Sequence, residues 1–425
     1  MTTNKSIKLA VVFAASLSSV ALFAQAAKQA ETEPTGFDVP WTERESLFIQ
    51  PLMDTYAPDS GFTPSLSWTG EQWSNLSGGM ERGTSWNSLF TIGFEQDFST
   101  LFKVENAGTL GMTMFYNANT HRGRAFFDGF GSAPSNIHAG DMTRVFEIYY
   151  ANSFETEIGT FSFRIGQLAA DEDFMGIDYA DLFLNSNFGA IPAVAGPGLA
   201  NGGAAFSQYA NATLGVTVAY EKDGFDAIIG FYNGDAGDDT VNNHGFDYDL
   251  RGVAFWYQLG YNYAINDYAG RVQVGGNYHS GKFERFDGNG TERNFYSFYI
   301  GAQQEIVKSS EGDPILGVYA RLAFAPEDEI SENTFYVEGG LNWFAPIPGR
   351  DDDVFGLGIS HMYTGKDARD SGVLRNQTVI EATYRIQFTP AISLQPSMQV
   401  FFNPVTDRDT REVCFVGGAR LEVLF

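Results

Sequence analysis

Arginine, carboxylate, amide and aromatic side chains recur at every second position in several stretches of this chain. Such spacing places them on one face of a β-strand, because successive side chains of a strand point to opposite faces. Arginine and carboxylate groups offer planar, paired hydrogen bonds to neighbouring hydroxyl groups, and aromatic rings stack on C–H groups. The residue types therefore predict noncovalent recognition of a polyhydroxylated solute such as a sugar.

Strand parity predicts which side chains share this polar face. We expect it to hold Glu71, Glu95, Glu147, Arg164, Gln273, Asn277, Gln303, Glu305, Arg321, Glu338, Asn342, Glu381, Arg385, Gln387, Gln395 and Gln399, with Tyr149, Trp256, Tyr319 and Tyr336. The residues that we select as solute contacts are Arg164, Glu147, Trp256, Arg321, Glu338, Asp171 and Asn185. For any one of them the alternative is structural, because arginine and glutamate on adjacent strands often pair with each other.

Residue patterns that would indicate catalysis are weak in this sequence. It has no serine nucleophile elbow, Walker loop or dinucleotide-binding glycine motif. The five histidines are not spaced like a zinc-binding pair on a helix. His279 and Ser280 invite comparison with an outer-membrane phospholipase, but neighbours on a strand point to opposite faces. We therefore predict no catalytic residue, no cofactor and no enzyme activity.

The elements that must position these residues are alternating strands. Apolar residues occupy every second position in 212–220, 253–263 and 378–388, among others. We predict sixteen strands, at 66–75, 85–98, 109–117, 143–154, 159–168, 212–220, 225–232, 252–263, 271–280, 294–307, 315–325, 334–344, 353–363, 377–388, 392–402 and 412–425. A half-buried sheet in water shows the same period. In a transmembrane antiparallel β-barrel, the apolar set faces lipid and the polar set faces the lumen.

The connections between the predicted strands alternate in length. Short ones include 221–224 and 389–391, and long ones include 118–142, 169–211, 233–251, 281–293 and 364–376. Short periplasmic turns and long outer loops are typical of bacterial outer-membrane barrels. About sixteen strands leave an aqueous channel. The fold class is therefore all-β, with one barrel domain over 66–425.

The two ends of the chain fit export to the outer membrane. Residues 1–26 read as a signal peptide, with Lys5 and Lys8 before an apolar stretch and Ala24-Gln25-Ala26 at the cleavage site. An uncleaved anchor is the alternative. Residues 27–65 form a predicted periplasmic segment, in which 42–50 could make a short helix. The last strand ends on Phe425, an aromatic residue suited to the membrane interface.

Composition narrows the partners. The formal net charge of −26 argues against nucleic acid as a ligand, and aromatic content of 15% fits a barrel in contact with membrane lipid. Cys414 is the only cysteine, so no intrachain disulfide is possible. Asp235, Asp238 and Asp239 in one outer loop offer the oxygen ligands that calcium prefers, although a solvated flexible loop is the simpler alternative.

The third long connection, 169–211, is unusually apolar for an outer loop. It contains Leu182-Phe183-Leu184 and Ala190-Ile191-Pro192-Ala193-Val194, and exposed loops seldom carry so much apolar surface. We expect it to fold inward and narrow the channel, and a lid over neighbouring loops is the alternative. The polar residues that would then line the constriction are Asp171, Glu172, Asp173, Asp178, Asp181, Asn185 and Asn187.

Three stretches resemble the carbohydrate-selective porins, the OprB family of Gram-negative bacteria. They are Trp68-Thr69-Gly70-Glu71 with 75–79, Arg164-Ile165-Gly166-Gln167-Leu168 with 171–189, and Leu394-Gln395-Pro396 with 399–404. The resemblance implies a sixteen-stranded passive sugar channel whose constriction carries charged and aromatic residues, with Arg164 in a matching motif. The strongly acidic balance favours a second hypothesis, a general or cation-preferring diffusion porin. A third is a structural or adhesive barrel whose loops block the lumen.

Overall fold

The computed structural model describes residues 36–79, 82–120, 132–200, 202–238, 240, 242–372, 376–404 and 413–425. The predicted signal peptide, residues 1–26, and the start of the following segment lie outside the described residues, as does Asp239. No helix in the described ranges is long and apolar enough to cross a membrane.

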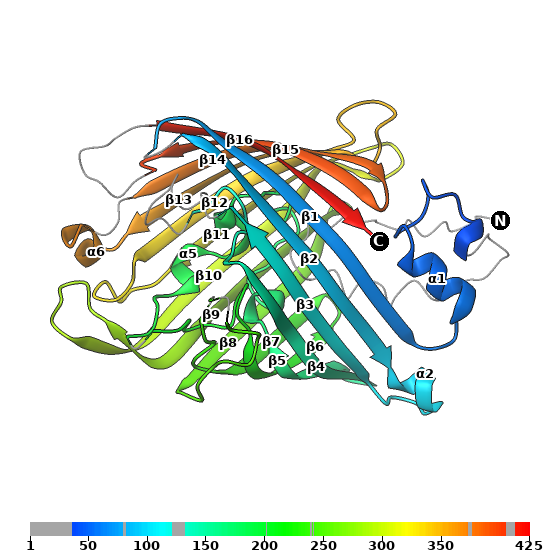
Figure 1. Ribbon diagram of the computed structural model, residues 1–425, viewed down its shortest axis with the longest axis horizontal. Coiled ribbons are helices and arrows are strands. Elements are labelled where there is room, and N and C mark those ends of the chain that lie inside the picture. Colours follow the sequence, from blue (N-terminus) through cyan, green and yellow to red (C-terminus); the bar gives the residue numbers. More distant parts are fainter. Residues whose placement is uncertain are drawn as a thin grey trace.

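Sixteen antiparallel strands close into a barrel in chain order, with β1 paired to β16 (Figure 1). Their bounds are β1 Phe62–Ser77, β2 Gly83–Asp97, β3 Thr109–Asn119, β4 Met142–Thr156, β5 Gly159–Leu168, β6 Thr213–Lys222, β7 Phe225–Asn233, β8 Val253–Ile265, β9 Tyr268–Glu284, β10 Thr291–Lys308, β11 Pro314–Phe324, β12 Asn333–Phe344, β13 Val354–Thr364, β14 Gln377–Thr389, β15 Ile392–Phe402 and β16 Val413–Leu424. The predicted strand number, order and closed architecture are confirmed.

The largest differences from the predicted bounds are at strand ends. β1 begins at Phe62 rather than residue 66, and therefore includes Pro64. Pro64 pairs with Phe94 of β2, whereas the pairing of β1 with β16 starts only at Ser67. A proline is tolerated there because its missing N–H falls where β1 has a neighbour on one side only. β9 and β10 are also longer than predicted and form an extended outer hairpin.

Alternation separates two faces of the barrel wall. One face exposes large apolar side chains on strand after strand, including Leu214, Val218, Ile229, Leu259, Val274, Ile300, Leu322, Leu357 and Ile359. The other face buries polar residues, including Glu71, Gln273, Arg321, Glu338, Glu381 and Gln399. A continuous apolar belt outside and polar residues inside is the pattern of a barrel that spans a membrane.

The segment before the barrel is attached to its C-terminal end. It contains the short helix η3 (Gly36–Asp38) and α1 (Ile49–Tyr56). The N–H groups of Leu47 and Ile49 donate to the carbonyl oxygens of Leu424 and Phe425, at 3.0 and 3.1 Å. The helix predicted at 42–50 was wrong in position, because α1 begins at Ile49. Pro51 lies in the first turn of α1, where proline is tolerated because no intrahelical hydrogen bond is lost.

Short helices occur in the connections. α2 (Phe98–Phe102) forms the turn between β2 and β3, and the Asp97 carboxylate caps it by accepting from the N–H groups of Ser99 and Thr100. α6 (Lys366–Asp370) lies between β13 and β14. The segment between β5 and β6 holds η4 (Ala170–Glu172), α4 (Ser186–Gly189) and α5 (Pro192–Ala195). We call this segment, residues 169–212, the long loop.

Candidate functional site

The long loop is hydrogen-bonded to side chains on the inner face of distant strands. Side-chain amides of β9, β12 and β15 donate to its backbone carbonyl oxygens: Gln273 to Gly176 at 2.8 Å, Asn342 to Tyr179 at 3.1 Å and Gln395 to Leu182 at 2.6 Å. The loop leaves β5 and meets strands as far around the ring as β15. These contacts place it along the inner wall, inside the barrel.

A buried ion pair holds the middle of the long loop. Arg321 of β11 and Glu338 of β12 are direct neighbours across the strands, and their side chains are 1% and 0% exposed. Arg321 also donates to the carbonyl oxygens of Met175, at 3.0 Å, and Phe188. Two loop carbonyl oxygens and one wall carboxylate thus share this guanidinium.

Glu381 of β14 holds the next part of the loop. Its carboxylate accepts from the N–H groups of Leu184 and Asn185, at 3.0 and 2.9 Å, and from the hydroxyl of Ser397 at 2.8 Å. The Asn185 side chain caps α4 by accepting from the Asn187 N–H at 3.1 Å, and its amide donates to Gln399 at 3.0 Å. Asn185 is fully buried.

Three of the seven predicted solute contacts, Arg321, Glu338 and Trp256, therefore lie on the wall beneath the loop, and a fourth, Asn185, is buried within the loop itself. Arg321 is hydrogen-bonded to the loop and paired with Glu338, and Trp256 is 0% exposed. The ring centroid of Trp256 is 5.6 Å from that of Phe174 and 5.3 Å from that of Phe206, both loop residues. This arrangement differs from the expected exposure of these four side chains to the passage. The physical reason is that the loop covers the three wall residues and packs its own Asn185 against the wall.

The other predicted contacts gather around Arg164 of β5. Its guanidinium is paired with Glu147 at 3.0 Å and with Asp173 at 2.9 Å, and it keeps 20% of its side-chain surface exposed. The guanidinium carbon lies 4.1 Å from the ring centroid of Tyr149. The Tyr149 hydroxyl donates to Glu95 at 3.2 Å. We call Arg164, Glu147, Asp173 and Tyr149 the Arg164 cluster.

Local backbone structure brings the Arg164 cluster together. The Glu147 carboxylate also accepts from the Ala169 N–H at 2.9 Å, which fixes the start of the long loop. The Tyr149 ring lies over Gly111 of β3, its direct cross-strand partner. A Cβ at position 111 would fall 2.4 Å from Tyr149 Cζ, so only glycine leaves room for this ring. Asp171, the remaining predicted contact, accepts from the Tyr209 N–H at 2.8 Å and lies two residues from Asp173.

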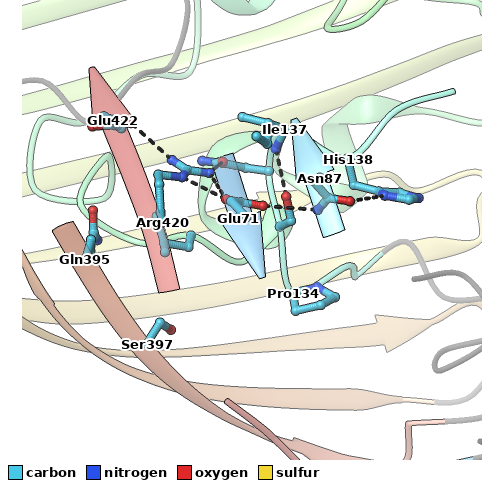
Figure 2. A network of polar contacts seen from close by, with 12 residues as sticks. Glu71, Asn87, Pro134, Ile137, His138, Gln395, Ser397, Arg420 and Glu422 are labelled. Carbon is cyan, nitrogen blue, oxygen red and sulfur yellow. Dashed lines mark hydrogen bonds and ion pairs between the residues drawn. The ribbon is translucent and has the colours of Figure 1, made fainter. Parts of the chain in front are cut away.

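A second inward segment, residues 132–141, was not predicted from the sequence. Its Ala133 exchanges hydrogen bonds with Ser186 of the long loop at 3.0 and 2.8 Å. Its Asn136 accepts from Arg420 of β16, which is paired with Glu71 of β1 at 2.6 Å, both side chains being 0% exposed. Figure 2 shows the pair of Arg420 and Glu71, at the seam where the first and last strands meet. Arg420 alternates with apolar residues, and that parity could have identified it.

The other sequence motifs have structural roles. The ring nitrogens of His279 lie 2.9 Å from the Gly234 carbonyl oxygen and 2.9 Å from the Gly281 N–H, and Ser280 accepts from the Val253 N–H. The side chains of His279 and Ser280 are thus both hydrogen-bonded to backbone groups. Asp235 accepts from the Gly237 N–H, and no group of three metal-ligating side chains occurs among the described residues.

Comparisons with known proteins agree with this architecture. A sequence model described as "Carbohydrate-selective porin, OprB family" matches residues 82–425. The high-pH structure of Pseudomonas putida OprB superposes with a TM-score of 0.80 at 16% identity, covering 91% of this chain and 100% of that one. The low-pH structure of the same protein gives 0.58 at 14% identity, covering 90% and 99%. No curated protein matches the chain. Because the family model spans well over half of its length, this chain belongs to the carbohydrate-selective porin family OprB.

Proposed function

We propose that sugars diffusing through this outer-membrane porin are recognised at the Arg164 cluster. The observation that carries the proposal is a guanidinium held over an aromatic ring and between two carboxylates, yet still partly exposed. Two N–H donors are used by the carboxylates, and a guanidinium has five. The donors that remain suit the hydroxyl groups of a sugar.

Unused acceptor capacity in the cluster supports the same proposal. Asp173 Oδ2 is buried and has no hydrogen-bond partner among the described residues. An unpaired buried acceptor costs about 1–3 kcal/mol, so Asp173 gains from a sugar hydroxyl once its side chain turns toward the passage. The site need only be weak, because a channel requires that solute both bind and leave. Arg321 and Glu338 contribute by holding the long loop rather than by touching solute.

Sugar flux into liposomes that contain the purified barrel tests this proposal. We expect a neutral hexose to enter with a rate that saturates as its concentration rises. A neutral solute of similar size that lacks vicinal hydroxyl groups should enter at a rate that stays linear, because it has no hydroxyl pair for the guanidinium to bind. Equal and linear rates for both solutes would contradict sugar recognition and leave a general diffusion porin.

A cation-preferring porin is the second candidate, and the composition of the long loop favours it. The loop carries Asp171, Glu172, Asp173, Asp178 and Asp181 and has no lysine, arginine or histidine. Carboxylates at a constriction concentrate cations. Under this hypothesis the channel prefers potassium over chloride, and it passes protonated amino sugars faster than neutral ones.

The pH dependence of ion selectivity checks the contribution of these carboxylates. Burial raises the pKa of Asp171 and of Asp181 to about 7. Each group is therefore charged above that pH and neutral below it. We expect the potassium-over-chloride permeability ratio, measured from reversal potentials, to fall as the pH is lowered from about 8 to about 6. The double variant Asp171→Asn and Asp181→Asn should reduce this pH dependence, and a ratio that stays constant in the unmodified chain would contradict the assignment.

A further inference from the structure

A second group of polar and aromatic side chains lies where the long loop meets β10 and β11. Gln303 of β10 donates to the carboxylate of Asp178 at 2.8 Å. Asp178 is exposed, and Gln303 and the adjacent Tyr179 are partly exposed. Gln303 Oε1 is buried and has no hydrogen-bond partner among the described residues. The group thus combines an exposed carboxylate, a partly exposed amide side chain and a partly exposed aromatic ring, which are the chemical features that bind a sugar.

The wall is shaped to receive the ring of Tyr179. A Cβ at Gly317 of β11 would fall 2.3 Å from Tyr179 Cε2 and 2.4 Å from Cζ, so the ring occupies the space that any other residue would fill. The Tyr179 carbonyl oxygen accepts from Asn342 at 3.1 Å. The backbone and the ring are therefore both fixed against the wall. An aromatic ring held in place in this way loses little entropy when it binds a solute.

The new group lies about a third of the way around the barrel wall from the Arg164 cluster. Asp173 pairs with Arg164 on β5, and Asp178 pairs with Gln303 on β10, five strands further around the ring. Five residues of backbone span at most about 18 Å even when fully extended, so the two groups are no farther apart than that along the loop. A solute with several sugar rings can contact both groups at once, whereas a single ring contacts one.

We propose that Asp178, Tyr179 and Gln303 form a second sugar subsite, which acts with the Arg164 cluster on solutes longer than a monosaccharide. The inference rests on the proposed function, because it assumes that the Arg164 cluster binds one sugar ring. The second subsite would make the channel bind longer sugar chains more tightly than single sugar rings. The second subsite contributes to the binding of oligosaccharides and leaves the binding of monosaccharides largely unchanged.

Single-channel recordings in planar bilayers, with glucose, maltose and maltotriose as blockers, test the proposal. Tyr179→Ala should raise the half-blocking concentration of maltotriose about three- to tenfold, the range expected for loss of one aromatic contact, and should change that of glucose less than about twofold. Tyr179→Phe keeps the ring and should resemble the unmodified chain. Gln303→Ala is a second, independent variant on the wall and should also weaken maltotriose block selectively.

Two glycine substitutions separate a binding role from a general disturbance of the loop. Gly317→Ala retains every polar group but displaces the Tyr179 ring, and it should reproduce the effect of Tyr179→Ala. Gly176→Ala is the matched control, because a Cβ there meets nothing within 4 Å, and it should change neither block.

The outcomes distinguish the two proposals. Block of the unmodified channel that persists unchanged in Tyr179→Ala and Gln303→Ala overturns the second subsite and leaves the Arg164 cluster intact. Equal weakening of glucose and maltotriose also overturns it, because that result indicates displacement of the whole loop. Absence of block by any of the three sugars in the unmodified channel overturns the proposed function, and the second subsite with it.

Discussion

Replacing Arg321 by alanine should release the middle of the long loop and raise the ionic conductance of the channel. The change removes the donor to Met175 and Phe188 and leaves the carboxylate of Glu338 buried without its partner. Breaking a buried ion pair from one side typically costs about 3–5 kcal/mol. We expect larger and noisier single-channel currents. We also expect the barrel to unfold at a lower temperature, as measured by gel electrophoresis of heated samples.

Two further variants assign this effect to the buried pair. The double variant Arg321→Met with Glu338→Leu replaces both charges by apolar groups of similar size, and barrel stability should recover relative to Arg321→Ala. Arg285→Ala breaks a pair with Asp287 that is about one quarter to one third exposed and lies in the connection between β9 and β10, and it should leave loop-dependent noise unchanged. Unaltered conductance and stability in Arg321→Ala would contradict the anchoring role.

Replacing Arg164 by alanine should weaken sugar block more than any other single change. The substitution removes the charged donor of the cluster and the cation that lies over Tyr149. A hydrogen bond from a charged group contributes about 1.5–3 kcal/mol, so the half-blocking concentration of glucose should rise roughly 10- to 150-fold. The measurement is the glucose dependence of single-channel current at fixed voltage.

Two control variants separate the charge of Arg164 from its geometry and its position. Arg164→Lys retains the positive charge but not the planar guanidinium, so it should keep the ion selectivity of the unmodified chain while its glucose block stays weaker. Arg271→Ala removes an equally exposed arginine that pairs with a carboxylate, Asp226, but is not stacked on Tyr149. If Arg271→Ala weakened glucose block as much as Arg164→Ala, the effect would follow from lumen charge rather than from the Arg164 cluster.

The strands and their two faces could be predicted from the sequence because their signal is local. Alternation within 377–388 requires no knowledge of the rest of the chain, and β14 runs from Gln377 to Thr389. The same parity placed Arg321, Glu338 and Glu381 on the inner face, where the structure has them. The extension of β1 through Pro64 was missed, because the tolerance of proline depends on where the neighbouring strand β16 stops.

The state of the inner side chains could not be predicted in the same way. The apolar character of Leu182 and Phe183 indicated that the long loop packs against something, and these two residues contact the wall at Gly356 and Gly358. Which wall residues the loop covers depends on contacts between residues more than a hundred positions apart, such as Arg321 with Met175. For this reason the prediction from the sequence treated Trp256, which the loop covers, in the same way as Arg164, which is partly exposed.

Segment 132–141 was missed for a related reason. It is short and of mixed composition, and side chains from distant strands hold it inside. Arg420, whose pair with Glu71 is shown in Figure 2, donates to Asn136, and Gln399 donates to the carbonyl oxygen of Pro134. A pattern within ten residues carries no information about partners so distant in the sequence. The sequence therefore predicted the strands of the barrel wall well, but it predicted only one of the two segments that lie inside the barrel.

The most direct measurement is the single-channel current of the unmodified barrel during titration with glucose. If sugar binds in the passage, the current falls in a saturable way as glucose is added, and the current noise peaks near half block. A current that declines only in proportion to the viscosity of the solution, with no saturation and no excess noise, would contradict a sugar-binding channel.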